Sequence, residues 1–245
     1  MKRLGWIVAI IVSIPLNLNA QFRTPLDTVS VKSSSFKASQ LIAPAALITT
    51  GSIVHFAAHN AIELPVKDAF QEWRRGGPER DFDNYLQYAP VVMDLGLGFL
   101  GAKAEHGFWD RLIEAAIAHV ALGATSGLMK EIIDSPRPNG VDNRSFPSGH
   151  ADLVFAGAEL VRMEYGWGWG GAAYAAATTV AVMRLYNNWH WTGDVVAGAG
   201  LGILCAHIGG WMLEPVKEMF GINTTIAPTV DPVSGAVCTT MNFRF

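Results

Sequence analysis

The sequence predicts an all-α protein, a membrane-associated bundle of six helices that is followed by a short C-terminal β-hairpin. Half of the 245 residues are hydrophobic and only 16% are charged, whereas a soluble globular chain has roughly 25% charged residues. The mean hydropathy of +0.25 also favours a membrane-associated chain. The net charge of −3 provides no basic surface, so nucleic acid is not an expected partner.

The first 20 residues have the pattern of a signal peptide. Lys2 and Arg3 precede the apolar run 4–16, and the small residue Ala20 follows it. This run is shorter than the roughly 20 residues of a full membrane span, which favours a cleaved signal over the alternative, a retained N-terminal anchor. Either alternative predicts export or insertion into a membrane.

Six apolar segments supply the predicted helices, and three of them are long and uncharged enough to be expected to span a membrane. The others are short or interrupted by charges, so protein rather than lipid could bury them. The six segments are residues 38–62, 84–102, 115–129, 151–158, 165–183 and 195–213, and the expected spans are 38–62, 165–183 and 195–213. Within the last segment, Gly198 and Gly202 predict a close contact between helices.

The remaining segments define the expected organisation. Residues 21–83 form a lead-in, the first apolar helix and a polar surface segment, within which residues 63–83 are interpreted as a solvated face with a helix broken at Gly76. Residues 84–213 form the candidate catalytic core. In the tail, 214–245, apolar and polar residues alternate from Val237 to Phe245, which predicts a strand, and Asp231-Pro232 and Ser234-Gly235 predict the turn before it.

Polar clusters interrupt the core at three places. The first contains Lys130 and Arg137, seven residues apart and therefore expected on the same face of a helix that Pro136 and Pro138 end. An Arg fork binds phosphate in a bidentate manner and Lys adds a point charge. The alternative is a basic cluster that only anchors a helix end.

The second cluster is Pro147-Ser148-Gly149-His150, directly before a predicted helix. Free N–H groups at a helix start bind anions, Gly149 permits close approach of the backbone, and Ser148 can cap the helix or donate to an oxygen. His150 would exchange protons at the edge of this site. A helix cap beside a core histidine is the alternative.

The third cluster contains Arg184, His190 and Asp194. His190 and Asp194 are four residues apart, so the carboxylate can bond one ring nitrogen and leave the other as a nucleophile or base. Arg184 would supply a third cation. Taken together, the three clusters hold the parts of a covalent phosphoryl-transfer site that needs no metal ion and no other cofactor.

The pattern Lys-x6-Arg-Pro, Pro-Ser-Gly-His and Arg-x5-His-x3-Asp resembles the type 2 phosphatidic acid phosphatase (PAP2) superfamily, which includes bacterial acid phosphatases and vanadium haloperoxidases. The resemblance covers roughly residues 84–213 and implies a PAP2-type six-helix bundle. It also implies a lipid phosphate or diphosphate substrate, such as phosphatidate, phosphatidylglycerol phosphate, polyprenyl diphosphate or lipid A phosphate, and a site that faces the periplasm. The oligomeric state is left open.

The resemblance also implies a role for each residue. His190 forms a phosphohistidine, Asp194 orients His190, and His150 protonates the leaving oxygen and then activates water. The phosphate-binding residues are Lys130, Arg137, Ser148, Gly149 and Arg184. The family usually has Ser before the third-motif Arg, where this chain has Met183. A soluble acid phosphatase, a vanadate-dependent haloperoxidase and a non-catalytic membrane protein are the alternatives.

Further residues have open interpretations. His55 and His59 have metal-ligand spacing, although hydrogen-bonded core histidines are favoured, and Asp94 is either functional or paired with a basic residue. Cys205 is expected to be a buried small hydrophobic residue, and a Cys205–Cys238 disulfide is the alternative. If six full spans follow a cleaved signal, the 130–150 loop would be cytoplasmic, which conflicts with the periplasmic site that the resemblance implies.

Overall fold

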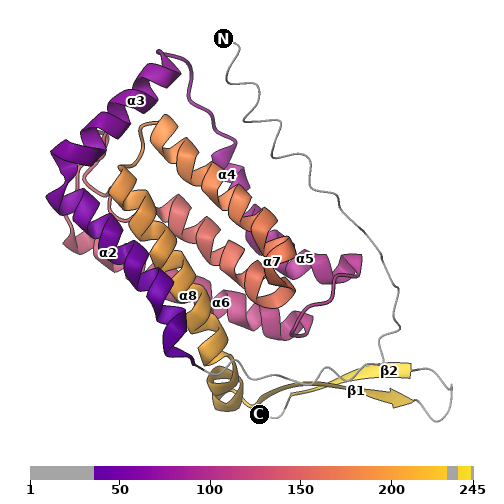
Figure 1. Ribbon diagram of the computed structural model, residues 1–245. Coiled ribbons are helices and arrows are strands. Elements are labelled where there is room, and N and C mark those ends of the chain that lie inside the picture. The colour runs from indigo at the N-terminus through magenta and orange to yellow at the C-terminus, as the bar shows by residue number, and fades with distance from the viewer. Residues whose placement is uncertain (1–35, 231–236, 244–245) are drawn as a thin grey trace.

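The computed structural model describes residues 36–230 and 237–243, so the predicted signal peptide and the predicted turn lie outside the described residues. Helices make up the body of the molecule, and two strands lie at one end of it (Figure 1). The α-helices are α2 (Ile42–Ala57), α3 (Leu64–Arg74), α4 (Asp83–Leu86), α5 (Ala89–Gly96), α6 (Phe108–Ile132), α7 (Gly149–Tyr186) and α8 (Thr192–Met219). Short helical turns extend three of these helices at Ala38–Leu41, His59–Glu63 and Leu97–Leu100.

Helix α7 is two helices folded against each other. Gly166 has φ 74° and ψ −173°, a conformation outside the helical region and open mainly to glycine. The chain reverses there, so that Tyr174 returns to Phe155 with ring centroids 5.9 Å apart, and Gly170 lies against Arg162. The expectation of separate helices on either side of residue 165 is therefore correct, and both ends of α7 lie at the same end of the bundle (Figure 1).

Glycines permit α8 to lie at the centre of the bundle. A Cβ on Gly202 would collide with the Asp152 carbonyl oxygen and lie 2.8 Å from the Ala156 nitrogen, both in α7. A Cβ on Gly193 would lie 2.6 Å from the Gly51 oxygen in α2. The predicted close contact at Gly198 and Gly202 is thus present, and α8 touches its neighbours backbone to backbone.

The segment 84–102 does not form the expected continuous helix. It is divided into α4, α5 and the turn Leu97–Leu100. Pro90 lies in the first turn of α5, where a missing N–H costs nothing. Gly101, with φ 87°, ends the segment.

Three helical segments among the described residues are long and apolar enough to cross a membrane, namely Ala38–Ala57, Phe108–Ile132 and Thr192–Met219. The segment 108–132 is among these three, although it was not expected to span, and the segment 165–183, which was expected to span, is not. Residues 165–183 are rich in Gly and Trp and pack Ala173, Ala177 and Val180 into the core. On α2 and α6 large apolar side chains point outward, among them Ile42, Ile53, Phe56, Val120 and Leu128. Such surfaces suit a lipid environment.

The tail forms strands β1 (Ile222–Val230) and β2 (Val237–Phe243), which pair antiparallel. Ile222 lies opposite Phe243 and Val230 lies opposite Val237, with an irregularity in the register between Asn223 and Ala227. The strands lie next to the end of α8, away from the end at which α2 meets α3 (Figure 1).

The backbone contact at Gly202 provides a test of the packing. Gly202→Ala should lower the free energy of unfolding by about 1–3 kcal/mol, because backbone atoms of α7 must move. Gly171→Ala is the control, since a Cβ there meets nothing within 4 Å and alanine favours a helix. Thermal unfolding in detergent would measure both, and equal midpoints would contradict the packing described for α7 and α8.

Candidate functional site

The predicted site residues meet at one end of the bundle. Lys130 comes from the end of α6, Arg137 from the loop 133–148, and His150 from the start of α7. Arg184 lies at the end of α7, and His190 lies directly before α8. The reversal at Gly166 brings the second and third clusters together. A cavity of about 310 Å³ lies between them, lined by Glu79, Asp81, Asn84, Lys130, Arg137, Gly149, His150, Arg184, Trp189 and His190.

The contacts of His190 indicate which ring nitrogen carries the hydrogen and which keeps its lone pair. Its Nε2 lies 3.0 Å from Nη1 of Arg137, and because a guanidinium can only donate, Nε2 accepts with its lone pair. Nδ1 then carries the hydrogen and donates to the Ser145 carbonyl oxygen at 2.9 Å. Nδ1 also faces Oδ2 of Asp194 at 3.4 Å. His190 is therefore oriented by two groups, of which the Ser145 carbonyl is the nearer.

Asp194 is completely buried and has partners on several segments. Its Oδ2 accepts hydrogen bonds from the Ser145 hydroxyl and from the Trp191 backbone N–H, the latter at 2.8 Å. Its Oδ1 lies 3.1 Å from Nδ1 of His55 in α2. The Asp194 carboxylate thus lies in contact with His190, with the loop 133–148, with the start of α8 and with the end of α2.

The three predicted cations line the cavity, and each is held by other contacts. Arg137 donates Nε to Oδ1 of Asp142 at 2.7 Å, and Arg184 forms a buried ion pair of 2.6 Å with Asp83. Lys130 donates to the carbonyl oxygens of Arg144 and Pro147. These contacts fix the positive charges before a substrate arrives, which is the condition for electrostatic catalysis.

His150 lines the same cavity as His190, and its Nε2 faces Oδ1 of Asn84 at 2.9 Å. Burial and the nearby cations, Arg184 first, lower the pKa of His150 to about 3. Burial lowers the pKa of His190 to about 4, against the opposing effect of Asp194. Both imidazoles are therefore neutral at pH 7, as a nucleophile must be.

Ser148 and Gly149 occupy the expected start of α7, with Ser148 at the N-cap position. The Ser148 side chain makes no capping hydrogen bond, which corrects one of the two roles considered for it. Its hydroxyl is buried and has no partner among the described residues. Its backbone N–H instead donates to the Asp194 carbonyl oxygen at 3.0 Å, which joins the starts of α7 and α8.

Two expectations about helical geometry are wrong, although the residues concerned do lie close together in the site. Helix α6 ends at Ile132, so Arg137 reaches the cavity from a loop and not from the same helical face as Lys130. Likewise, α8 begins at Thr192, so His190 precedes the helix on which Asp194 lies. The pair is positioned by hydrogen bonds at a helix start rather than by helical spacing.

Several contributors were not predicted from the sequence. Asp83 and Glu63 belong to the segment that was interpreted as a solvated face, yet both are buried. Glu63 accepts from the Gly193 N–H at 3.0 Å and also contacts the rings of His55 and His59. Both histidines therefore bond the Glu63 carboxylate, as the favoured interpretation expected. His55 is buried in the core, whereas the side chain of His59 is 40% exposed.

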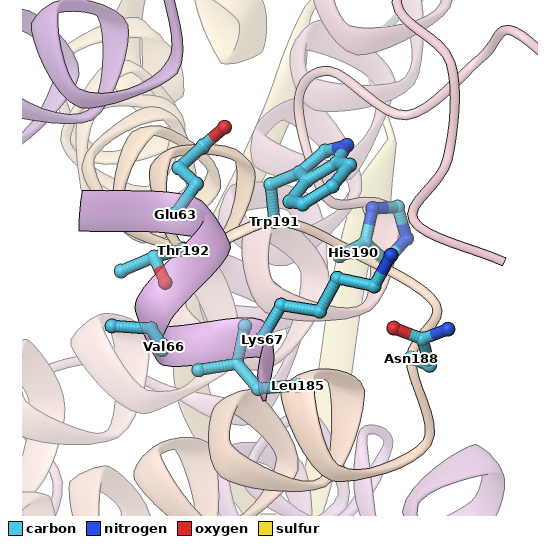
Figure 2. Close-up of a pocket in the computed structure, with 8 residues that line it drawn as sticks. All are labelled: Glu63, Val66, Lys67, Leu185, Asn188, His190, Trp191 and Thr192. Atoms are coloured by element: carbon cyan, nitrogen blue, oxygen red, sulfur yellow. The ribbon is translucent and has the colours of Figure 1, made fainter. Parts of the chain in front are cut away.

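Figure 2 shows a second, smaller pocket, which His190 also lines. Lys67 of α3 extends across this pocket, and its amine lies 5.3 Å from the centroid of the Trp191 ring. Trp189 lies on the cavity side, where the guanidiniums of Arg137 and Arg184 are each 5.5 Å from its ring. Both tryptophans therefore line the pockets, and Trp189 contacts two of the cations that are predicted to bind phosphate.

Other candidates are placed as follows. Cys205 is buried and free, as expected. Arg111 lies beside Asp94 but donates to the Asp94 backbone oxygen, so the predicted pairing of the Asp94 carboxylate with a basic residue does not form by a hydrogen bond. Met183, where the family usually has Ser, is largely buried in α7.

Comparison with known proteins agrees with this geometry. Residues 111–215 match the model of the PAP2 superfamily and include all three polar clusters. This part of the chain is therefore similar to the PAP2 superfamily, the class of protein that its residue pattern resembles.

Individual relatives are more distant. The chain is 26% identical over 240 residues to the lipid A 1-phosphatase of Porphyromonas gingivalis, a match that covers 91% of this chain and 54% of that protein. The chain thus spans about half the length of this curated relative. Among solved structures, Aquifex aeolicus LpxE aligns with a TM-score of 0.47 at 19% identity, over 61% of this chain and 94% of that chain. A transmembrane PAP2 type phosphatidylglycerolphosphate phosphatase from Bacillus subtilis aligns with a TM-score of 0.42 at 15% identity, over 72% and 96% of the two chains.

The lowered pKa of His190 predicts a pH-dependent stability. Between about pH 6.5 and 4, the unfolded chain takes up a proton at this residue that the folded protein does not bind. The free energy of unfolding therefore falls as the pH falls, and His190 contributes up to roughly 1.4 kcal/mol per pH unit. In the His190→Asn variant this contribution is absent, so unfolding measured from pH 7 to 4.5 should show a shallower slope than in the wild type. Identical slopes would mean that His190 titrates normally in the folded protein.

Proposed function

We propose that the protein hydrolyses a lipid phosphate or diphosphate without a metal ion, through a phosphohistidine on His190. The observation that carries the proposal is the lone pair on Nε2 of His190, which faces a cavity lined by Lys130, Arg137 and Arg184. A neutral imidazole beside fixed cations is the arrangement that attack on a phosphate anion requires.

In the first step, Nε2 of His190 attacks phosphorus and the bond to the leaving oxygen breaks. Asp194 and the Ser145 carbonyl stabilise the hydrogen on Nδ1 as the ring becomes positive. His150 supplies the proton to the leaving oxygen. Its pKa of about 3 is low in part because of the three cations, and a bound phosphate offsets their charge, so substrate binding favours the protonated form.

In the second step, His150 has lost its proton and can accept one from water. The resulting hydroxide attacks phosphorus, the phosphorus–nitrogen bond breaks, and phosphate leaves with His190 neutral again. Lys130, Arg137, Arg184, the Ser148 hydroxyl and the Gly149 N–H hold the phosphate oxygens through both steps. The unpartnered hydroxyl of Ser148 supports its part in this set.

A lipid is the favoured substrate class because apolar side chains cover the outer faces of α2 and α6. The similarity to a lipid A 1-phosphatase supports a phosphorylated glycolipid, while phosphatidate, phosphatidylglycerol phosphate and polyprenyl diphosphate belong to the same chemical class. A soluble acid phosphatase is less well supported, since it would expose these faces to water.

The reaction predicts a specific loss of activity. His190→Ala should reduce phosphate release from a lipid phosphate in mixed micelles to background, because the variant lacks the nitrogen that is proposed to attack phosphorus. His119→Ala is the matched control, since His119 bonds the Ala115 carbonyl within α6 and takes no part in the cavity.

The same assay tests the two other parts of the mechanism. Orthovanadate should inhibit the wild type, and activity should persist without added divalent metal. Full activity of His190→Ala would exclude the phosphohistidine, and a strict need for added Mg²⁺ would exclude metal-free chemistry.

We further propose that the site faces the periplasm. The start of α2 and the end of α8 lie at the opposite end of the bundle from the loop 133–148 (Figure 1). If these helices span the membrane, a periplasmic site places Met219 on the cytoplasmic side and Val141 on the periplasmic side. Both residues are well exposed and suit single-cysteine labelling.

The test uses a variant in which Cys205 and Cys238 are replaced by alanine. A membrane-impermeant maleimide should label Val141→Cys in intact spheroplasts, and Met219→Cys only after lysis. Labelling in the reverse order would place the site in the cytoplasm and contradict the proposed orientation.

A further inference from the structure

A second cluster of buried charge lies at the other end of the bundle. His106, which precedes α6, approaches Glu114 of α6 and Glu164 of α7, and one ligand atom from each lies within 4.8 Å of the others. Glu114 is 1% exposed and Glu164 is 3% exposed. Asp94 of α5, also 1% exposed, is close enough to affect the charge of this cluster. Four segments therefore bring an imidazole and three carboxyl groups together away from water.

Two of the three carboxyl groups of this cluster, those of Glu114 and Asp94, lack donors among the described residues, whereas Glu164 accepts from His106. Neither oxygen of Glu114 and neither oxygen of Asp94 has a hydrogen-bond partner among the described residues. Glu159, a buried glutamate of the same helix as Glu164, shows the contrast, because it accepts hydrogen bonds from Arg162 and Tyr174 and pairs with His207. Buried carboxylates without donors are costly, so Glu114 and Asp94 require a positive charge from elsewhere.

The nearby cations are engaged with other groups. Arg111 donates Nη1 to the Asp94 backbone oxygen and to the Tyr165 hydroxyl. Lys217 pairs with Asp110 and Glu214, each at 3.0 Å. His106 binds Glu164 through both its backbone N–H and its Nδ1.

The charge balance around Asp94 agrees with these contacts. The buried carboxyl groups of Asp94, Glu114 and Glu164 lie near one imidazole, that of His106, and one guanidinium, that of Arg111. Negative charge therefore exceeds positive charge in this part of the bundle, and neutralising it requires either protons or a bound cation.

We propose that His106, Glu114 and Glu164 bind a divalent transition-metal ion, with Zn²⁺ or Mn²⁺ as the best match. One imidazole and two carboxylates form a borderline-hard donor set, which suits these ions. Ligands on opposite sides of such an ion lie at most about 4.2 Å apart, since each bond is about 2.1 Å. The present separations therefore need to contract by less than about 1 Å. Asp94 contributes negative charge beside the ion.

The role of this ion is structural. Its ligands connect the segment before α6, the first turns of α6 and the last turn before the reversal at Gly166. Along α6, Glu114 is roughly 24 Å from Lys130, at 1.5 Å per residue. The ion therefore takes no part in the reaction at His190, which is proposed to need no metal.

The test measures metal content rather than activity. The full chain, purified in detergent with a tag that does not bind metal, is equilibrated with Zn²⁺ or Mn²⁺, freed of excess ion by gel filtration and analysed by mass spectrometry. We expect about one ion per chain in the wild type and a large loss in Glu114→Gln and His106→Gln. The unfolding midpoint of the wild type should also rise on metal addition and fall with a chelator.

Glu159→Gln is the matched control, because it removes a buried glutamate whose partners are present and leaves the cluster intact. It should lose stability yet keep its ion, which separates misfolding from loss of a ligand. The proposal is overturned if the wild type retains no ion and if its unfolding midpoint does not change when a chelator is added. A midpoint that instead rises in Glu114→Gln would show that Glu114 and Glu164 share a proton.

Discussion

The active end of this protein depends on one buried carboxylate, that of Asp194. A carboxylate that is buried away from water is stable only when hydrogen bonds or positive charges compensate for its lost hydration. Here the donors to Oδ2 come from the loop 133–148 and from the start of α8, and the imidazole of His55, at the end of α2, lies 3.1 Å from Oδ1. His55 can approach Asp194 only because Gly51 and Gly193 allow α2 and α8 to touch through their backbones. Packing of small residues and orientation of the nucleophile are therefore parts of one constraint.

Much of the site could be predicted because its residue types are unusual in so apolar a chain. Their local geometry could not be predicted in the same way. The spacing of Lys130 and Arg137 suggests one helical face, yet the helix ends between them. The Asp83–Arg184 ion pair joins residues 101 positions apart, and no periodicity in the sequence carries that information. Charges in 63–83 suggest a solvated face, which holds for most of them but not for Glu63 and Asp83.

The sequence predicts where the apolar helices lie, but it does not predict whether lipid or protein buries each of them. An uncharged segment such as 165–183 is compatible with burial by lipid or by protein, and hydropathy alone does not separate the two. In the fold it packs its alanines and Val180 against the first half of α7. Gly166 decides this outcome, because the reversal there pairs the two halves. The same reversal returns Arg184 to the end where His150 begins the helix.

The two buried clusters have opposite electrostatic needs. At the His190 end, three fixed cations lower the pKa of His150. Carboxylates pair with Arg137 and Arg184 and neutralise only part of the positive charge, so an anion is the missing component. At the Glu114 end, carboxylates outnumber the available cations, and a positive ion is the missing component. In each case the fold holds like charges together that would otherwise separate, and it does so with long-range packing. A ligand that completes either cluster stabilises the folded state, because the unfolded chain cannot gather these charges.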